Sequence, residues 1–158
     1  MGKLFDQICA YFEENQWVFD RVEGREVIRM GFQGEVGQWT CFAQAREKQQ
    51  QFVFYSRPDF QVPETYRSAM AEFVTRANYG VILGNFELDF NDGEIRYKTA
   101  IDIEGGELLP QFIRNLVGTN ITMMDRHLLA LQSVATGERT PLEALDDMEK
   151  PHGPAGEA

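Results

Sequence analysis

The segment from residue 81 to residue 103 alternates apolar and polar side chains on both sides of Asp92-Gly93, a pattern typical of a β-hairpin. A two-residue turn at that dipeptide predicts an apolar face with the strand partners Phe90–Ile95, Leu88–Tyr97 and Ile82–Ile103. The opposite face then carries two pairs of opposite charge, Asp89–Arg96 and Glu87–Lys98. A slip of one residue would place apolar side chains opposite charged ones, so the pattern specifies the register strongly. The hairpin is therefore the sharpest architectural signal in the chain.

Helical periodicity appears on both sides of this hairpin. Apolar side chains recur at helical spacing over about 3–15, over about 63–77 and from about residue 107 onward. Gly118-Thr119-Asn120 is expected to interrupt the third region. Thr140 and Glu143 have the spacing of a capping box, which predicts the start of one more helix.

Strand patterns fill the stretch between the first two helices. Alternation or short apolar runs predict strands near 17–21, 28–33, 39–45 and 51–55. The short turns between them favour an antiparallel meander. We therefore expect an α+β fold, with an antiparallel sheet of about five strands and helices packed on one side. The expected order is helix, three strands, helix, two strands, helix.

The length and apolar content suit one domain with a single core, since the chain has 158 residues, of which 43% are apolar. We expect this domain to span residues 1–148. Residues 149–158 are rich in Pro, Gly, Ala and Glu, which predicts a disordered tail.

The net charge of −10, from 25 acids and 15 bases, argues against nucleic acid and against an anionic membrane surface as partners. The sequence contains no run of 18 apolar residues, so no membrane span is predicted. Asp6 interrupts the apolar run that a secretion signal would need. Cys9 and Cys41 are far apart and are expected to be buried free thiols. A cytoplasmic location is the expectation.

The residues that carry chemistry form no recognised motif, so we expect no catalytic centre, no cofactor and no metal site. His127 lacks a partner, because Asp125, two residues away, points to another side of a helix. Asp102 and Glu104 precede Gly105-Gly106, where acids could bind a cation or act in acid–base chemistry. A solvated loop explains those two acids better.

Some of the methionines could form a protein-binding surface, because their flexible side chains adapt to different partners. Met70 matches the apolar stripe of its helix and is better explained as core. Met123 and Met124 are adjacent and cannot both point fully inward, so core and interface remain equally open for them.

The order of elements resembles the fold of class-I type III secretion chaperones. Asn78-Tyr79-Gly80, followed by 84–89 and by 92–97, is similar to the YbjN family of bacterial sensory transduction regulators. The likeness extends over about residues 3–136, and its specific motif lies within 78–103.

This resemblance implies a small, acidic, protein-binding chain without transferable catalytic residues, which is usually dimeric. It places the dimer contact on the helix of residues 66–77 and the strand of residues 81–90. The candidate interface side chains are Tyr66, Met70, Phe73, Met123 and Met124. Two other functions stay open. One is a small-ligand sensor or enzyme with a pocket between sheet and helices, using Asp102, Glu104 and His127. The other is a structural subunit of a larger complex.

Overall fold

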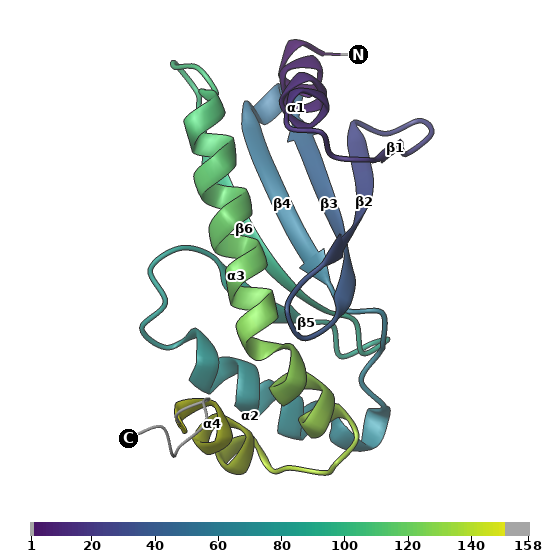
Figure 1. The fold of residues 1–158 in the computed structure, drawn as a ribbon, viewed down its shortest axis with the longest axis vertical. Helices are drawn as coiled ribbons and strands as arrows, with labels where there is room; N and C mark the ends of the chain where they lie inside the picture. Colours follow the sequence, from purple (N-terminus) through teal and green to yellow (C-terminus); the bar gives the residue numbers. More distant parts are fainter. Residues whose placement is uncertain (1, 151–158) are drawn as a thin grey trace.

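The computed structural model describes residues 2–150, which form one six-stranded antiparallel sheet in the order β1-β2-β3-β4-β6-β5 (Figure 1). The strands are β1 (Asp20–Arg21), β2 (Val27–Gln33), β3 (Gln38–Arg46), β4 (Gln51–Arg57), β5 (Asn85–Leu88) and β6 (Ile95–Asp102). The helices within this part of the chain are α1 (Lys3–Glu14), α2 (Arg67–Asn78), α3 (Pro110–Ala135) and α4 (Pro141–Glu149). The predicted α+β class and order of elements are confirmed. β1 is the short strand expected near residues 17–21, and α4 is the helix expected at Thr140.

One face of the sheet is covered by helices. Figure 1 shows α1 and α3 crossing it, while α2 and α4 lie together at the end where α3 finishes. Alternate side chains of the central strands point to this face and are buried, including Trp39, Cys41, Phe52, Phe54, Ile95 and Tyr97. Both cysteines are free and buried, as predicted.

The long helix α3 is continuous, so the predicted interruption at Gly118-Thr119-Asn120 was wrong. Its 26 residues correspond to about 39 Å. Contacts with β4 and β6 stabilise this helix, and they outweigh the cost of about 1 kcal/mol that a glycine imposes on a helix interior. Within the described residues, no helix is both long and apolar enough to cross a membrane.

Asn120 joins the middle of α3 to the sheet. Its side chain is fully buried, and Nδ2 donates to the carbonyl oxygens of Phe54 at 2.9 Å and Tyr97 at 3.1 Å. The same nitrogen lies 3.2 Å from Oγ1 of Thr99, which itself donates to the carbonyl oxygen of Leu116. Oδ1 of Asn120 is buried without a hydrogen-bond partner. The helix is therefore fixed to β4 and β6 by polar contacts inside the core.

The predicted hairpin exists, but its predicted register was wrong by two residues. The observed partners are Leu88–Ile95, Phe86–Tyr97, Glu87–Arg96 and Asn85–Lys98. A shift of two residues keeps each side chain on its face, so the division into an apolar and a charged face remains correct. Glu87 forms ion pairs with both Arg96 at 2.8 Å and Lys98 at 3.1 Å, although its strand partner is Arg96.

The error arises because the turn occupies residues 89–94 and not Asp92-Gly93 alone. The side chains of Asp89 and Asp92 accept hydrogen bonds from the backbone N–H groups of Asn91 and Glu94, which widens the turn. The first strand is also shorter than predicted, since β5 begins at Asn85. Ile82 and Phe90, predicted on the buried face, are 91% and 57% exposed.

The outer edge of the sheet at β5 is closed by a side chain. Oδ1 of Asn78, the last residue of α2, accepts from the backbone N–H of Phe86 at 2.7 Å. Nδ2 of Asn78 donates to the carbonyl oxygen of Phe86 at 3.1 Å. One amide thus occupies the two backbone groups that Phe86 would offer to a further strand.

Two helix starts were also predicted. α4 begins with the predicted capping box of Thr140 and Glu143. α2 begins later than predicted, at Arg67, after a 3₁₀ turn over Glu64–Tyr66.

At the C-terminal end of the domain, the predicted tail lies outside the described residues from residue 151 onward.

Candidate protein-binding surfaces

A groove of about 1100 Å³ lies between the β2–β3 turn, the second half of α3, and α4. Its apolar lining comes from all three parts and includes Phe32, Val36, Ile121, Leu129, Ala144 and Met148. Leu129 and Val36 are 53% and 44% exposed, which is high for large apolar side chains. The groove thus presents apolar side chains to solvent within a concave surface.

Asp125 holds the first wall of the groove in place. Its carboxylate oxygens accept hydrogen bonds from the backbone N–H of Glu35, both at 3.1 Å, and from that of Val36 at 3.3 Å. A Cβ at position 34 would lie 2.5 Å from Oδ1 of Asp125, so Gly34 permits this close approach. The turn is therefore anchored to α3, and it does not have to order when a partner binds.

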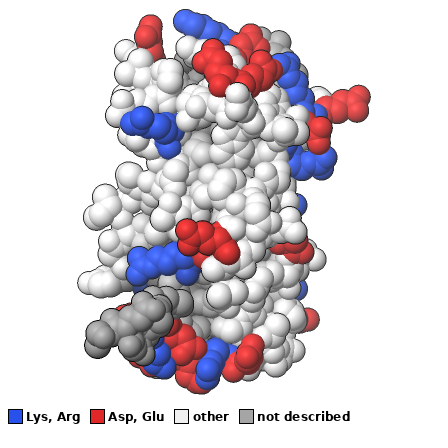
Figure 2. All heavy atoms as spheres, viewed as in Figure 1, with Lys and Arg blue, Asp and Glu red and all other residues white. Residues whose placement is uncertain are grey.

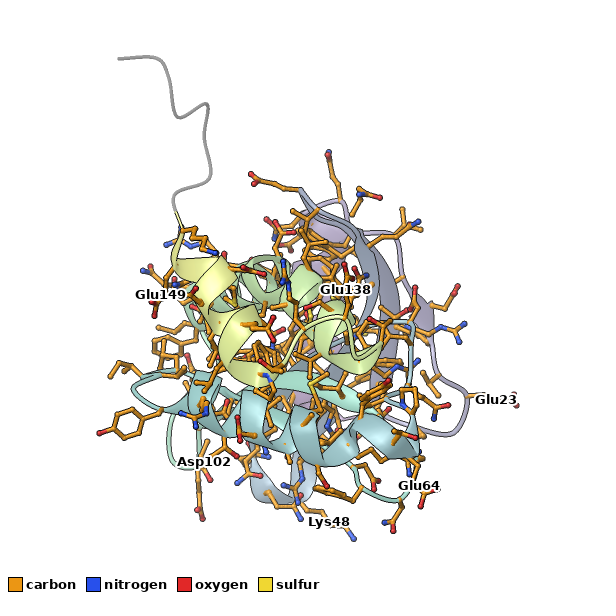
Figure 3. The ribbon with its side chains drawn as sticks, turned by 90° about the horizontal axis from the view of Figure 1, so that it is seen from below. Glu23, Lys48, Glu64, Asp102, Glu138 and Glu149 are labelled. Carbon is orange, nitrogen blue, oxygen red and sulfur yellow. The ribbon has the colours of Figure 1, made fainter. Side chains whose placement is uncertain are left out.

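The second wall is α4, which packs on α3 and α2. Figure 3 shows this end of the molecule from below, with α2 and α4 side by side. Arg139 bridges Glu143 at 3.3 Å and Asp147 at 3.0 Å, and the hydrogen bonds from Thr140 lower the pKa of Glu143. The capping box and this ion-pair cluster fix the start of the wall.

The charged lining of the groove is mainly acidic, with Glu35, Asp125, Glu138 and Asp147 against Arg126 and Arg139. Acids stand on both walls, since Glu35 belongs to the turn and Asp147 to α4. Glu138, labelled in Figure 3, lies in the connection between α3 and α4. Within residues 2–150, the side chains of Glu35, Glu138 and Arg126 form no ion pair. These charges remain available to a partner.

A second exposed surface lies on the loop of residues 79–84, which connects α2 to β5. Tyr79 and Ile82 are 92% and 91% exposed, and Leu83 is 50% exposed. The loop is nevertheless held by hydrogen bonds to its backbone: the hydroxyl of Tyr97 donates to the carbonyl oxygen of Leu83 at 2.6 Å, and the N–H of Val81 donates to the carbonyl oxygen of Asn78 at 3.1 Å. A fixed loop that displays three large apolar side chains is characteristic of an interaction site.

The residues suspected of catalysis are not brought together. Asp102 is exposed at the end of β6, where Nε2 of Gln51 and the backbone N–H of Glu104 donate to its carboxylate and lower its pKa. His127 contacts Phe86, the strand partner of Tyr97, which lies about 17 Å along β6 from Asp102. In the described residues, no three His, Cys, Asp or Glu side chains are placed to hold a metal ion.

His127 belongs to the edge of the core. It is 5% exposed, and its ring centroid lies 4.9 Å from that of Phe86. Nδ1 lies 2.7 Å from the carbonyl oxygen of Met123 and, in the neutral ring, donates to it. Burial lowers the pKa of His127, and the nearby charge of Arg126 acts in the same direction, while the hydrogen bond to Met123 opposes them.

This lowered pKa makes stability depend on pH. The unfolded chain binds a proton at His127 below about pH 6.5, while the folded chain binds it only at lower pH. The free energy of unfolding is therefore expected to fall as pH drops from about 7.5 to about 5.5, on either side of the ordinary His pKa. Urea unfolding at both values checks this. His127→Gln should reduce the drop, while His152→Gln, outside the described residues, serves as the matched control and should leave it unchanged.

The predicted interface side chains separate into two groups. Met70, Phe73 and Met124 are fully buried, because they face the chain's own core, and no partner can contact them without unfolding. Tyr66 and Met123 are half-buried at the edge of the core and remain candidates.

Sequence reasoning missed Leu129 and the apolar side chains of the 79–84 loop as surface residues. Leu128 and Leu129 are adjacent in a helix, a signal that one of them must point outward, as it did for the two methionines. The loop was missed because Ile82 fits the alternation of the predicted hairpin strand, which was expected to begin at residue 81.

Comparisons with known proteins agree with the architecture. Among solved structures, the chain is similar to the crystal structure of YbjN, a putative transcription regulator from E. coli, at 9% identity and a TM-score of 0.64. That match covers 84% of this chain and 92% of YbjN, and it shows a shared fold. A chain of the HopA1–SchA chaperone–effector complex matches at 14% identity and a TM-score of 0.48, covering 78% of this chain and 91% of that one.

None of the curated proteins matches the chain. The family model that matches residues 4–133 is YbjN, described as a putative bacterial sensory transduction regulator. This match spans most of the domain, from α1 nearly to the end of α3. The chain therefore belongs to the YbjN family.

Proposed function

We propose that this protein is a non-enzymatic homodimer that binds other proteins in a regulatory or chaperone-like role. The observation that carries the proposal is the pair of preformed apolar surfaces, the groove and the 79–84 loop, on a chain whose candidate catalytic residues lie apart. The groove receives the partner, and the loop contributes to contact between the two copies.

The 79–84 loop supports a contact between copies because it continues the exposed side of α2. That side carries small or charged residues, Ser68, Glu72, Thr75 and Arg76, and ends at Tyr79. Stable dimers bury about 800 Å² per partner, more than three side chains supply, so we include the exposed side of α2 in the contact. Asn78 occupies the backbone of Phe86, so the copies meet through side chains and not through pairing of the β5 edges.

Ile82→Glu is expected to convert the dimer to a monomer, because it places a charge in the centre of the proposed apolar contact. Light scattering coupled to size-exclusion chromatography at micromolar concentration measures the mass. Val18→Glu is the matched control, since Val18 is 90% exposed but belongs to neither surface. A monomeric mass for the unchanged protein would refute the dimer.

A photo-crosslinking amino acid at position 129 tests the protein-binding role of the groove in living cells. We expect stable adducts with one or more proteins at position 129 and none at position 142, because Leu142 is 57% exposed on α4 but does not line the groove. Equal adducts at both positions, or none at either, would contradict this function for the groove.

A further inference from the structure

We infer that the groove between the β2–β3 turn, α3 and α4 binds a basic amphipathic helix of a partner protein. This inference rests on the proposed function, because it names the partner class for the same surface. The 79–84 loop plays no part in it.

The dimensions of the groove suit a short helix. Its lining extends along α3 from Ile121 to Ser133, which corresponds to about 18 Å, the length of about 12 helical residues. We call this part of α3 the floor of the groove. The turn fixed by Asp125 and the helix α4 form its two walls. An amphipathic helix placed between two walls buries its apolar stripe and keeps its polar side in solvent.

The arrangement of side chains along the floor selects an apolar stripe. Ile121, Asp125, Leu129 and Ser133 recur at intervals of four and therefore follow one line along α3. Asp125 is bound to the turn, so Ile121 and Leu129 provide the apolar contacts on this line. Leu129, more than half exposed, is the side chain that gains most from being covered.

Charge selects the basic class of helix. The lining carries four acids and two bases, with acids on both walls, and the whole chain has a net charge of −10. Glu35 and Glu138 have no ion-pair partner within residues 2–150, so a lysine or arginine flanking the apolar stripe would meet an unpaired carboxylate. Figure 2 shows charged side chains of both signs at the two ends of this side of the molecule and in a smaller cluster between them, with uncharged surface around it. Positive flanks on an apolar stripe complement a groove whose charged lining is mainly acidic, and long-range attraction increases the rate of association.

The charge of Arg126 provides a test of whether the partner helix is positively charged. It lies in the same lining and has no ion pair within the described part of the chain. A basic helix is repelled by this guanidinium, so Arg126→Glu should tighten binding. Glu35→Lys should weaken it. Both side chains are exposed, so neither change disturbs the core.

The experiment uses a fluorescein-labelled model peptide of about 14 residues, with leucine on one helical face and lysine on the other, to cover the about 18 Å floor. Fluorescence anisotropy with the full-length protein should give saturable binding. Leu129→Lys should weaken it at least about tenfold, and Leu142→Lys, the matched control on α4, should not change it. A scrambled peptide of the same composition and a version with glutamate in place of lysine should both bind at least about tenfold more weakly.

Each contrary result has a defined meaning. Equal binding of the scrambled peptide, or equal loss in the variants at 129 and 142, overturns the groove as a helix site. Equal binding of the glutamate peptide overturns the basic class of partner. A change of molecular mass in Leu129→Lys would show that a second copy occupies the groove, which also overturns the inference. If Leu129→Lys fails to fold by circular dichroism, Val36→Lys on the β2–β3 turn replaces it.

The two proposals fail differently. Protein adducts at position 129 in cells, together with no binding of the lysine peptide, would refute only the partner class. Absence of adducts at position 129 would refute the groove as a protein-binding site altogether.

Discussion

Replacing Asn120 by aspartate is expected to lower the free energy of unfolding by about 4 kcal/mol at neutral pH. In the unchanged protein, the carbonyl oxygens of Phe54 and Tyr97 accept hydrogen bonds from Nδ2 of Asn120. The substitution removes this donor and places a carboxylate next to both carbonyl oxygens. The site is fully buried, so water cannot screen the charge. Urea unfolding followed by circular dichroism measures the loss.

Asn115→Asp is the matched control, since Asn115 lies on the same helix but is exposed to solvent. It should change the free energy of unfolding by less than about 0.5 kcal/mol. Burial should raise the pKa of an aspartate at position 120, so its deficit should shrink as pH falls through that raised pKa, because the folded form then binds the proton more readily than the unfolded form. Equal losses at positions 115 and 120 would contradict the role of Asn120.

Asn120 also marks a limit of sequence reasoning. Gly118-Thr119-Asn120 predicts a break in a helix because all three residues have low helix propensity. The structure keeps the helix continuous because the asparagine satisfies backbone carbonyls of β4 and β6. Those partners are 66 and 23 residues away, and no local pattern reveals contacts of that kind.

Gly93→Ala is expected to destabilise the protein by about 3 kcal/mol, more than a positive φ angle alone explains. Gly93 has φ 79°, and an added Cβ would collide with the carbonyl oxygen of Val62 and lie 2.9 Å from its nitrogen. The hydrogen bond from Val62 N–H to the carbonyl oxygen of Gly93, now 2.8 Å long, would be disrupted. This contact attaches the hairpin turn to the segment before α2.

Gly24→Ala separates the cost of the positive φ angle from the cost of the collision with Val62. Gly24 has a similar φ of 71°, but a Cβ there meets nothing within 4 Å. It should cost only about 1 kcal/mol, the penalty for a left-handed backbone in a residue with a side chain. Thermal and urea unfolding of the two variants give the comparison. Equal costs would show that the contact with Val62 contributes nothing.

The hairpin shows why faces could be predicted and the register could not. Alternation of side chains identifies the faces, and a shift of two residues leaves that alternation intact. The length of the turn depends on the hydrogen bonds of Asp89 and Asp92 and on the contact between Gly93 and Val62, a residue 31 positions earlier in the chain. Asp-Gly indicates a turn but does not distinguish a two-residue turn from this longer one.

The candidate surfaces also include some features that the local sequence pattern reveals and others that depend on contacts between distant residues. Met70 and Phe73 lie on the apolar side of α2, which periodicity identifies, and that side is covered by the chain's own elements. The groove depends on how the β2–β3 turn meets α3, about 90 residues later in sequence, through Asp125. Only the adjacency of Leu128 and Leu129 hinted at an outward apolar side chain in that region.

The bond between Asn78 and Phe86 makes the width of the sheet depend on the position of a helix. One amide at the end of α2 occupies the place where a seventh strand would bond to Phe86, so this part of the β5 edge is closed while that helix end stays beside it. Displacing the end of α2 would therefore do two things at once. It would free the backbone of Phe86 for another chain, and it would move the loop that carries Tyr79 and Ile82. The closure of this edge and the position of the loop therefore both depend on one side-chain amide.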